Sequence, residues 1–136
     1  MHDHNWLAIA VAAVAAFLIG GLWYSPLLFA KQWMVANLIP TDQMETMKAA
    51  APRAYAVSVV CFLVMAFILE VFINHMGEAT LKGGVFVAFH AWLGFAATIG
   101  LTANIYSNKP IRAYFIDAGY QLVYMLAMGA ILGAWR

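Results

Sequence analysis

The sequence predicts an all-α protein, an integral membrane bundle of four transmembrane helices. Of its 136 residues 65% are hydrophobic and only 10% are charged, whereas about a quarter of the residues in a soluble domain are charged. Four stretches, at 5–30, 54–69, 83–108 and 118–135, contain no Lys, Arg, Asp or Glu. Crossing a bilayer takes about 20 mostly apolar residues, and each stretch reaches that length alone or together with the residues that flank it.

A soluble helical bundle with a very apolar core is the alternative. Each helix of such a bundle must show a polar face to water, and the stretch 5–30 has none. We therefore expect a single transmembrane domain over residues 1–136, with helices at about 5–25, 53–75, 81–106 and 110–135.

The first expected helix carries a small residue at every fourth position, namely Ala8, Ala12, Ala16 and Gly20. Helices associate in lipid through such faces because small side chains let two backbones approach closely. Simple alanine richness is the alternative, but the unbroken register favours a packing face.

A short helical loop, interfacial or cytoplasmic, is expected between the first and second transmembrane helices. Ser25-Pro26 is typical of a helix start with proline in the first helical position. The polar stretch 40–52 is typical of a turn and a short capped helix that ends at Pro52. Aromatic side chains that anchor at the membrane interface are expected at Trp23, Tyr24, Trp33 and Trp135.

The distribution of Lys and Arg predicts the orientation in the membrane. The connections at 75–80 and 107–110 are short, so the helices that they join are expected to be antiparallel neighbours. Five basic residues fall on the side of the 31–53 and 107–112 segments, and two fall on the other side. Because basic residues are enriched in cytoplasmic loops, both termini are expected outside.

The last expected helix has two distinct faces. Asp117, Gln121 and Tyr124 share one face at helical periodicity. Gly129 and Gly133 form a G-x-x-x-G pair on a second face, which predicts close packing against another helix. Together with the small residues of the first helix, this pair exceeds what four short helices need internally, and it predicts a homo-oligomer.

A polar seam inside the membrane is the main candidate site. Counted at about 1.5 Å per residue from the cytoplasmic helix ends, Glu70, His90 and Tyr124 lie within about one helical turn of each other in depth. Arg112 is the one cation near Asp117 whose side chain could bend inward, and Asn104 could supply a neutral donor. The expected seam comprises Glu70, His90, Asn104, Asp117, Gln121 and Tyr124. The alternative is a hydrogen-bond network between helices that serves assembly alone.

Other chemistry has less support in the sequence. His2, His4, His75 and Glu78 are suitable metal ligands, but they lack close spacing, and no metal or cofactor is expected. There is no nucleophile elbow, phosphate loop or cysteine pair, which makes an enzyme the least supported class. A net charge of +1 gives no electrostatic case for nucleic acid.

Three motifs resemble those of a known family. Residues 23–29 are Trp-Tyr-Ser-Pro-Leu-Leu-Phe, followed by Lys31 and Trp33, and residues 92–95 are Trp-Leu-Gly-Phe. The third motif comprises Ala-Gly-Tyr at 118–120 and Met-Gly-Ala-Ile-Leu-Gly-Ala-Trp-Arg at 128–136. Over residues 5–136 the chain resembles the bacterial membrane proteins grouped as domain of unknown function 1761. The resemblance implies a small four-helix membrane protein, and it implies no catalytic or binding residues because that family has no established activity.

We therefore expect a multi-pass protein of the bacterial cytoplasmic (inner) membrane that moves or senses an ion or small solute through its polar seam. The rival hypothesis is a non-transporting structural or partner-binding subunit whose polar residues only specify assembly. The expected partners are the lipid bilayer and further copies of the chain.

The orientation can be checked by labelling single cysteines in a background in which Cys61 is replaced by alanine. Cysteines at positions 44 and 108 should react only with reagent applied from the cytoplasmic side, and one at position 78 only from outside. Labelling of position 78 from the cytoplasmic side would reverse the assigned orientation.

Overall fold

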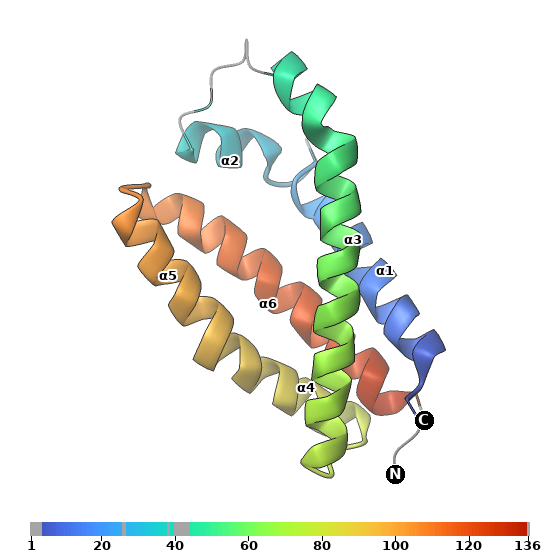
Figure 1. Cartoon of the computed structure of the whole chain (residues 1–136). Helices are drawn as coiled ribbons and strands as arrows, with labels where there is room; N and C mark the ends of the chain where they lie inside the picture. The colour runs from blue at the N-terminus through green and yellow to red at the C-terminus, as the bar shows by residue number, and fades with distance from the viewer. Residues whose placement is uncertain (1–3, 26, 38, 40–43, 136) are drawn as a thin grey trace.

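The computed structural model describes residues 4–25, 27–37, 39 and 44–135, and every regular element within these ranges is a helix. Four helical spans are long and apolar enough to cross a membrane: Trp6–Trp23, Thr46–His75, Leu81–Tyr106 and Ile111–Ala134. The predicted all-α class is thereby confirmed. The start of the first span and the end of the last lie at the same end of the molecule (Figure 1).

Helix α1, Trp6–Trp23, begins at Asn5, whose side-chain oxygen accepts a hydrogen bond from the backbone N–H of Ala8. Such a side-chain cap satisfies a backbone donor that has no partner within the helix. Ala8, Ala12 and Ala16 are completely buried, and α1 packs against both α3 and α6. The small face that the sequence predicts is therefore a packing face within the chain.

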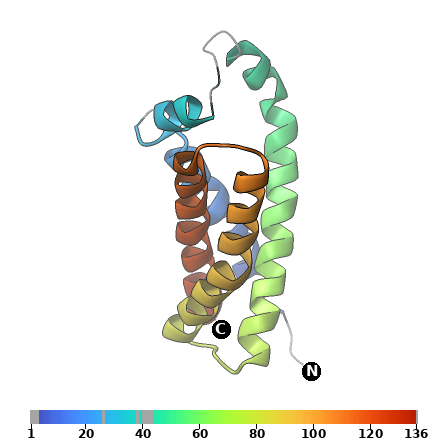
Figure 2. The same ribbon diagram turned by 90° about the vertical axis from the view of Figure 1, so that its left-hand side faces the viewer.

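The chain turns sharply after α1 and forms the short helix α2, Ala30–Ala36, at the opposite end from the N-terminus (Figures 1 and 2). Phe29 donates its backbone N–H to the carbonyl of Trp23, which closes the turn. Ala36 is buried against Ala113 and Ile116 of α6. The expected roles of Pro26 and of residues 40–43 lie outside the described residues.

Helix α3, Met44–His75, runs through Pro52, so the expectation that Pro52 ends a short separate helix is wrong. A proline inside a helix removes one backbone hydrogen bond and pushes on the carbonyl four residues earlier, here that of Lys48. Residues 46–50 and Pro52 itself are exposed. The released carbonyl therefore has room to move, and the helix continues.

The third span consists of α4, Leu81–Ala91, a π-helical turn, Trp92–Ala96, and α5, Ala97–Tyr106. A π turn inserts extra backbone into a helix and changes which side chains face its neighbours. Figure 2 shows α5 and α6 side by side and antiparallel, joined by the short turn after Tyr106.

Helix α6, Ile111–Ala134, lies at the centre of the bundle, because it is in contact with every other helix. It approaches α4 so closely that glycines are required on both sides. A Cβ atom on Gly84 would collide with the carbonyl oxygen of Gly129, and one on Gly133 would collide with that of Thr80. The G-x-x-x-G pair is thus used inside the chain.

These contacts change the basis of the predicted homo-oligomer. The prediction of a homo-oligomer rests on the alanines of α1 and the glycines of α6. Both sets of residues already pack against other helices of the same chain. Replacing Gly133 by leucine would strike α4 of the same chain, so that variant tests folding before it tests self-association. Self-association stays a prediction.

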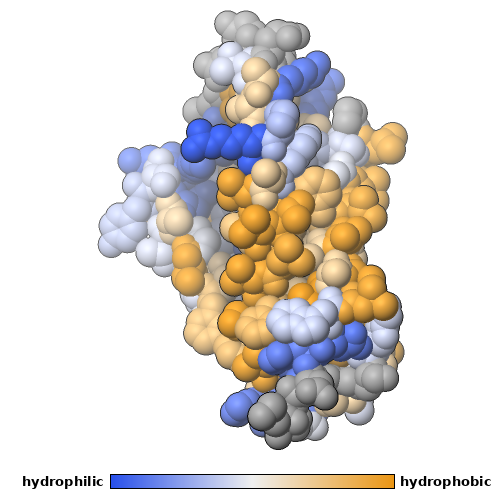
Figure 3. All heavy atoms as spheres, turned by 45° about the vertical axis from the view of Figure 1, so that its right-hand side comes forward, coloured by the Kyte–Doolittle hydropathy of each residue, from blue (hydrophilic) through white to orange (hydrophobic). Residues whose placement is uncertain are grey.

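The surface agrees with a membrane location. Figure 3 shows hydrophobic side chains gathered around the middle of the visible face and hydrophilic side chains toward both ends. Large apolar side chains on α3 are exposed along most of its length, including Val57, Val60, Val64, Ile68 and Phe72. Such a surface is unfavourable in water, whereas contact with lipid chains keeps its apolar side chains away from water.

The close approach of α4 and α6 predicts opposite effects of two glycine-to-alanine changes. Gly84→Ala should destabilise the protein by about 1–3 kcal/mol, as overpacking does elsewhere. Gly21→Ala has no atom within 4 Å of the new Cβ, and it should be neutral or stabilising by up to about 1 kcal/mol. Thermal unfolding in one detergent measures both, and equal stability of Gly84→Ala and wild type would contradict this packing.

Candidate functional site

The carboxyl group of Asp117 is held by two side chains from the other end of the sequence. Tyr24 donates its hydroxyl to Oδ1 of Asp117 at 2.5 Å, and Trp33 donates its indole N–H to the same oxygen at 3.1 Å. Trp23 donates to the backbone carbonyl of Ile116 at 2.9 Å. These three hydrogen bonds thus connect the turn between α1 and α2 to the first half of α6.

Aromatic rings surround this interaction and limit the access of water. Tyr24 packs edge-on against Trp33 and Tyr120, with ring centroids 5.8 and 5.2 Å apart. Burial, and after it the hydrogen bond to Asp117, raises the pKa of Tyr24 far above its usual value. The hydroxyl of Tyr24, which any tyrosine keeps protonated at neutral pH, therefore remains a donor to Asp117 in alkaline solution as well.

Beside Asp117, a polar pocket of about 210 Å³ lies between α5 and α6, next to the turn that joins them. Six of its nine lining residues have polar or charged side chains. These six are Asn104, Ser107, Lys109, Tyr114, Asp117 and Gln121. Both hydrogen bonds that Asp117 accepts from described residues go to Oδ1, which leaves Oδ2 without a partner among them.

Asn104 lines this pocket and has a buried side-chain acceptor without a described partner. The residue is only 7% exposed, and its Nδ2 donates to the carbonyl of Pro110 at 3.3 Å. Among the described residues, Oδ1 of Asn104 has no hydrogen-bond partner. Exchanging the two amide atoms would not help, because the Pro110 carbonyl can only accept. Such a group in a native protein calls for an explanation, for example a bound water.

Two opposite charges lie on the wall of the pocket without pairing. In the described part of the chain the one ion pair within 4.0 Å joins His4 and Glu70, so Lys109 does not neutralise Asp117. The expected pairing of Arg112 with Asp117 is also not found. Arg112 is exposed, and the neutral donors of Tyr24 and Trp33 take its place.

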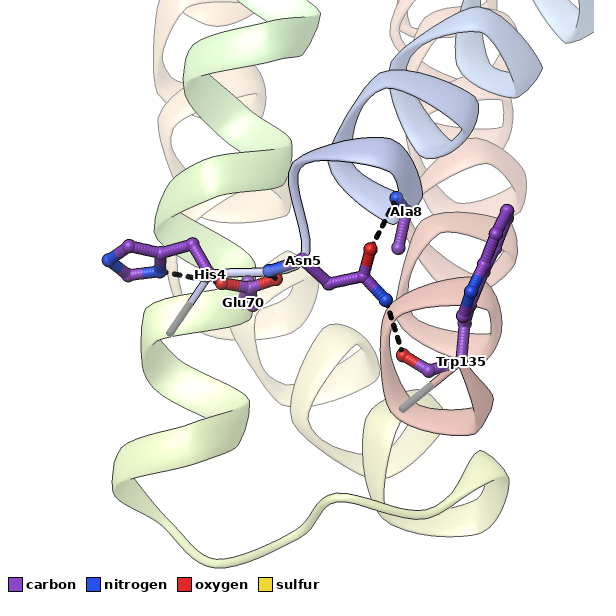
Figure 4. A network of polar contacts seen from close by, with 5 residues as sticks. All are labelled: His4, Asn5, Ala8, Glu70 and Trp135. Atoms are coloured by element: carbon purple, nitrogen blue, oxygen red, sulfur yellow. Dashed lines mark hydrogen bonds and ion pairs between the residues drawn. The ribbon is translucent and has the colours of Figure 1, made fainter. Parts of the chain in front are cut away.

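Glu70 lies at the opposite end of the bundle, in the network drawn in Figure 4. Only 1% of its surface is exposed. Its Oε1 lies 2.7 Å from Nδ1 of His4, and its Oε2 accepts the backbone N–H of Asn5 at 3.1 Å. Asn5 also donates from Nδ2 to the carbonyl of Trp135 at 3.1 Å. This network joins the start of α1, the last turns of α3 and the end of α6.

The remaining seam residues lie apart from both polar groups. Tyr124 is buried in the apolar core, where it packs edge-on against Phe62 with ring centroids 5.1 Å apart. His90 is exposed and bonds to the carbonyl of Phe86 in its own helix at 2.8 Å. The expected meeting of His90 with Tyr124 is not found, because α4 turns its Gly84 and Ala88 side toward α6, and His90 lies on the other side.

The structure therefore brings together three of the six seam residues, Asn104, Asp117 and Gln121. The sequence indicates Tyr24 and Trp33 only as interface anchors, and it does not indicate their role as donors. Helical periodicity could have identified Tyr114 as a neighbour of the site, since it precedes Asp117 by three residues and Gln121 by seven on one helical face. No sequence pattern identifies Lys109, which lies in the turn between α5 and α6.

The bonds to Asp117 predict a difference between two substitutions. Asp117→Asn keeps the acceptor for Tyr24 and Trp33, and should cost at most about 1 kcal/mol, the range of polar contacts in membrane bundles. Asp117→Leu leaves both donors without a partner and should cost about 1–3 kcal/mol for each buried one. Thermal unfolding in one detergent decides, with Thr102→Val as control, because its hydroxyl bonds only within α5. A leucine variant as stable as wild type would show that Asp117 has no such partners.

Comparison with known proteins places the chain in a family. Residues 7–133 match the family described as "Protein of unknown function (DUF1761)". A search of curated proteins and a search of solved structures found no match. Since the match covers nearly the whole chain, the protein belongs to this family, as its motifs indicate.

Proposed function

We propose that the protein is a sensing or translocating module of the bacterial cytoplasmic membrane, and that it binds a small polar solute or ion between α5 and α6. One observation carries the proposal. Oδ2 of Asp117 and Oδ1 of Asn104 have no described hydrogen-bond partner, and both residues line the same pocket.

The energetics support a ligand at this position. A buried acceptor left without a partner costs about 1–3 kcal/mol, and such groups in native proteins call for an explanation such as a bound ion or water. A pure assembly network would pair its members with each other, as Glu70, His4 and Asn5 do at the other end. Asp117 instead lines a pocket and has one oxygen that accepts no bond from the described residues.

Binding or sensing has more support than passage through a single copy. Beyond the pocket, toward the far end of α6, the buried side chains of Tyr124, Met125 and Met128 fill the core. Around Met128 this core is made of apolar side chains, including Leu69, Ile73 and Leu132. A solute that enters from the pocket side would therefore stop there, unless the helices rearrange or a second copy supplies the rest of a path.

The second candidate is a structural or partner-binding subunit, and the network of Glu70 favours it. That network fastens three helices together and leaves no open acceptor. On this hypothesis the hydrogen bonds of Asp117 would likewise only hold helices together. Removing Asp117 would then change folding or assembly and would have no effect on the binding of any small molecule.

Ligand-dependent stability in nanodiscs tests the proposal. The panel comprises sodium, potassium and ammonium chloride and four small amino acids: glycine, alanine, serine and β-alanine. A ligand present at a hundred times its Kd stabilises the folded protein by about 2.7 kcal/mol, so at least one compound should raise Tm. Asp117→Asn should abolish the increase, and the matched control Thr102→Val should retain it. An unchanged Tm with every compound, or an increase that survives in Asp117→Asn, would contradict the proposed function.

A further inference from the structure

The chemistry of the pocket wall is specific enough to indicate what kind of solute it accepts. Lys109 supplies a positive group from the turn between α5 and α6, and Asp117 supplies a negative one from the second turn of α6. They are more than 4.0 Å apart, and neither forms an ion pair with another described residue. The wall thus carries two opposite formal charges that do not neutralise each other.

A ligand with a single charge would suit this wall poorly. A simple cation bound at Asp117 would face the ammonium group of Lys109, and a simple anion bound at Lys109 would face the carboxyl group of Asp117. Like charges close together disfavour binding, most of all where water is scarce. A solute that carries both charges meets two attractive partners and no repulsive one.

The hydrogen-bonding groups of the pocket wall are also of two kinds, acceptors at Asp117 and donors at Lys109. At Asp117 the open group is an acceptor, Oδ2, which suits an ammonium group with its three N–H donors. Lys109 has only donors to offer, and Ser107 has a hydroxyl beside it in the lining. These groups suit a carboxylate.

We infer that the pocket binds a small zwitterion, an amino acid or related solute, with its ammonium group at Asp117 and its carboxylate at Lys109. The inference rests on the proposed function and specifies its ligand class. The volume agrees, because about 210 Å³ lies below the roughly 300–1,000 Å³ of sites for drug-sized molecules. The solute is therefore small, on the scale of glycine, alanine or serine.

Three probes of similar size separate the charge types. Glycine carries both groups, ethylammonium carries only the positive one, and acetate carries only the negative one. Binding is measured by calorimetry with the full chain in nanodiscs. Glycine, or alanine, serine or β-alanine in its place, should bind at least about tenfold more tightly than ethylammonium or acetate, the effect of one lost charge-assisted contact.

Two variants assign the ends of the ligand. Lys109→Gln should weaken zwitterion binding about tenfold or more, and it should leave ethylammonium binding unchanged or tighter because a repulsive charge is gone. Asp117→Asn should weaken both ligands. Lys82→Gln is the matched control, because Lys82 is an exposed lysine at the start of α4, away from the pocket, and its loss should change neither.

The outcomes separate this inference from the proposed function. If ethylammonium, sodium or potassium binds as tightly as the amino acids and Lys109→Gln has no effect, the pocket is a cation site, and only the zwitterion is disproved. If acetate alone binds and Asp117→Asn tightens it, the assigned ligand class is wrong. If none of the amino acids, cations or acetate binds, both the inference and the proposed function fail.

Discussion

A polar group within the hydrocarbon layer must find its partner inside the protein, and α6 is where most of these partners are. Trp23 and Trp92 donate their indole N–H groups to the backbone carbonyls of Ile116 and Ala118. A helical carbonyl has a second lone pair, so it accepts such a bond without giving up its own. These bonds hold α1 and the π turn against α6, and the glycines of α4 and α6 bring the backbones close enough for the rest to form.

The same constraint is met differently at the two ends of the bundle. At one end, Glu70 is enclosed by His4 and Asn5, and both its oxygens are used. At the other, the bonds to Asp117 occupy one oxygen only, and the nearby Asn104 keeps an unused acceptor. The first end is therefore closed, whereas the second has an oxygen of Asp117 without a described partner and the separate charges of Lys109 and Asp117, on which the proposed binding site rests. The apolar core around Tyr124 keeps the two ends apart.

The fold was largely predictable, because helix number depends on the length of charge-free stretches, and these are local. The site was only partly predictable. The face shared by Asp117 and Gln121 follows from helical periodicity, but Trp33 lies 84 residues from Asp117, and no local pattern joins them. His90 was misplaced because α4 carries both a small-residue side and a histidine side. The glycines of α6 determine that the small-residue side of α4 packs against α6. Pro52 failed as a helix end because the first turns of α3 are exposed and tolerate the lost bond.

The central claim is that Asp117 is held by Tyr24 and Trp33 while it keeps one oxygen for the pocket. The indole N–H resonances of the five tryptophans in a ¹⁵N NMR spectrum test it most directly, with the Trp33 signal assigned by its loss in Trp33→Phe. Asp117→Leu should move the Trp33 signal strongly and leave that of exposed Trp6 unchanged, and adding the solute that binds to wild type should also move the Trp33 signal. If the Trp33 signal stays in place in Asp117→Leu, the carboxyl group is not bound there, and both the turn between α1 and α2 and the proposed site are wrong.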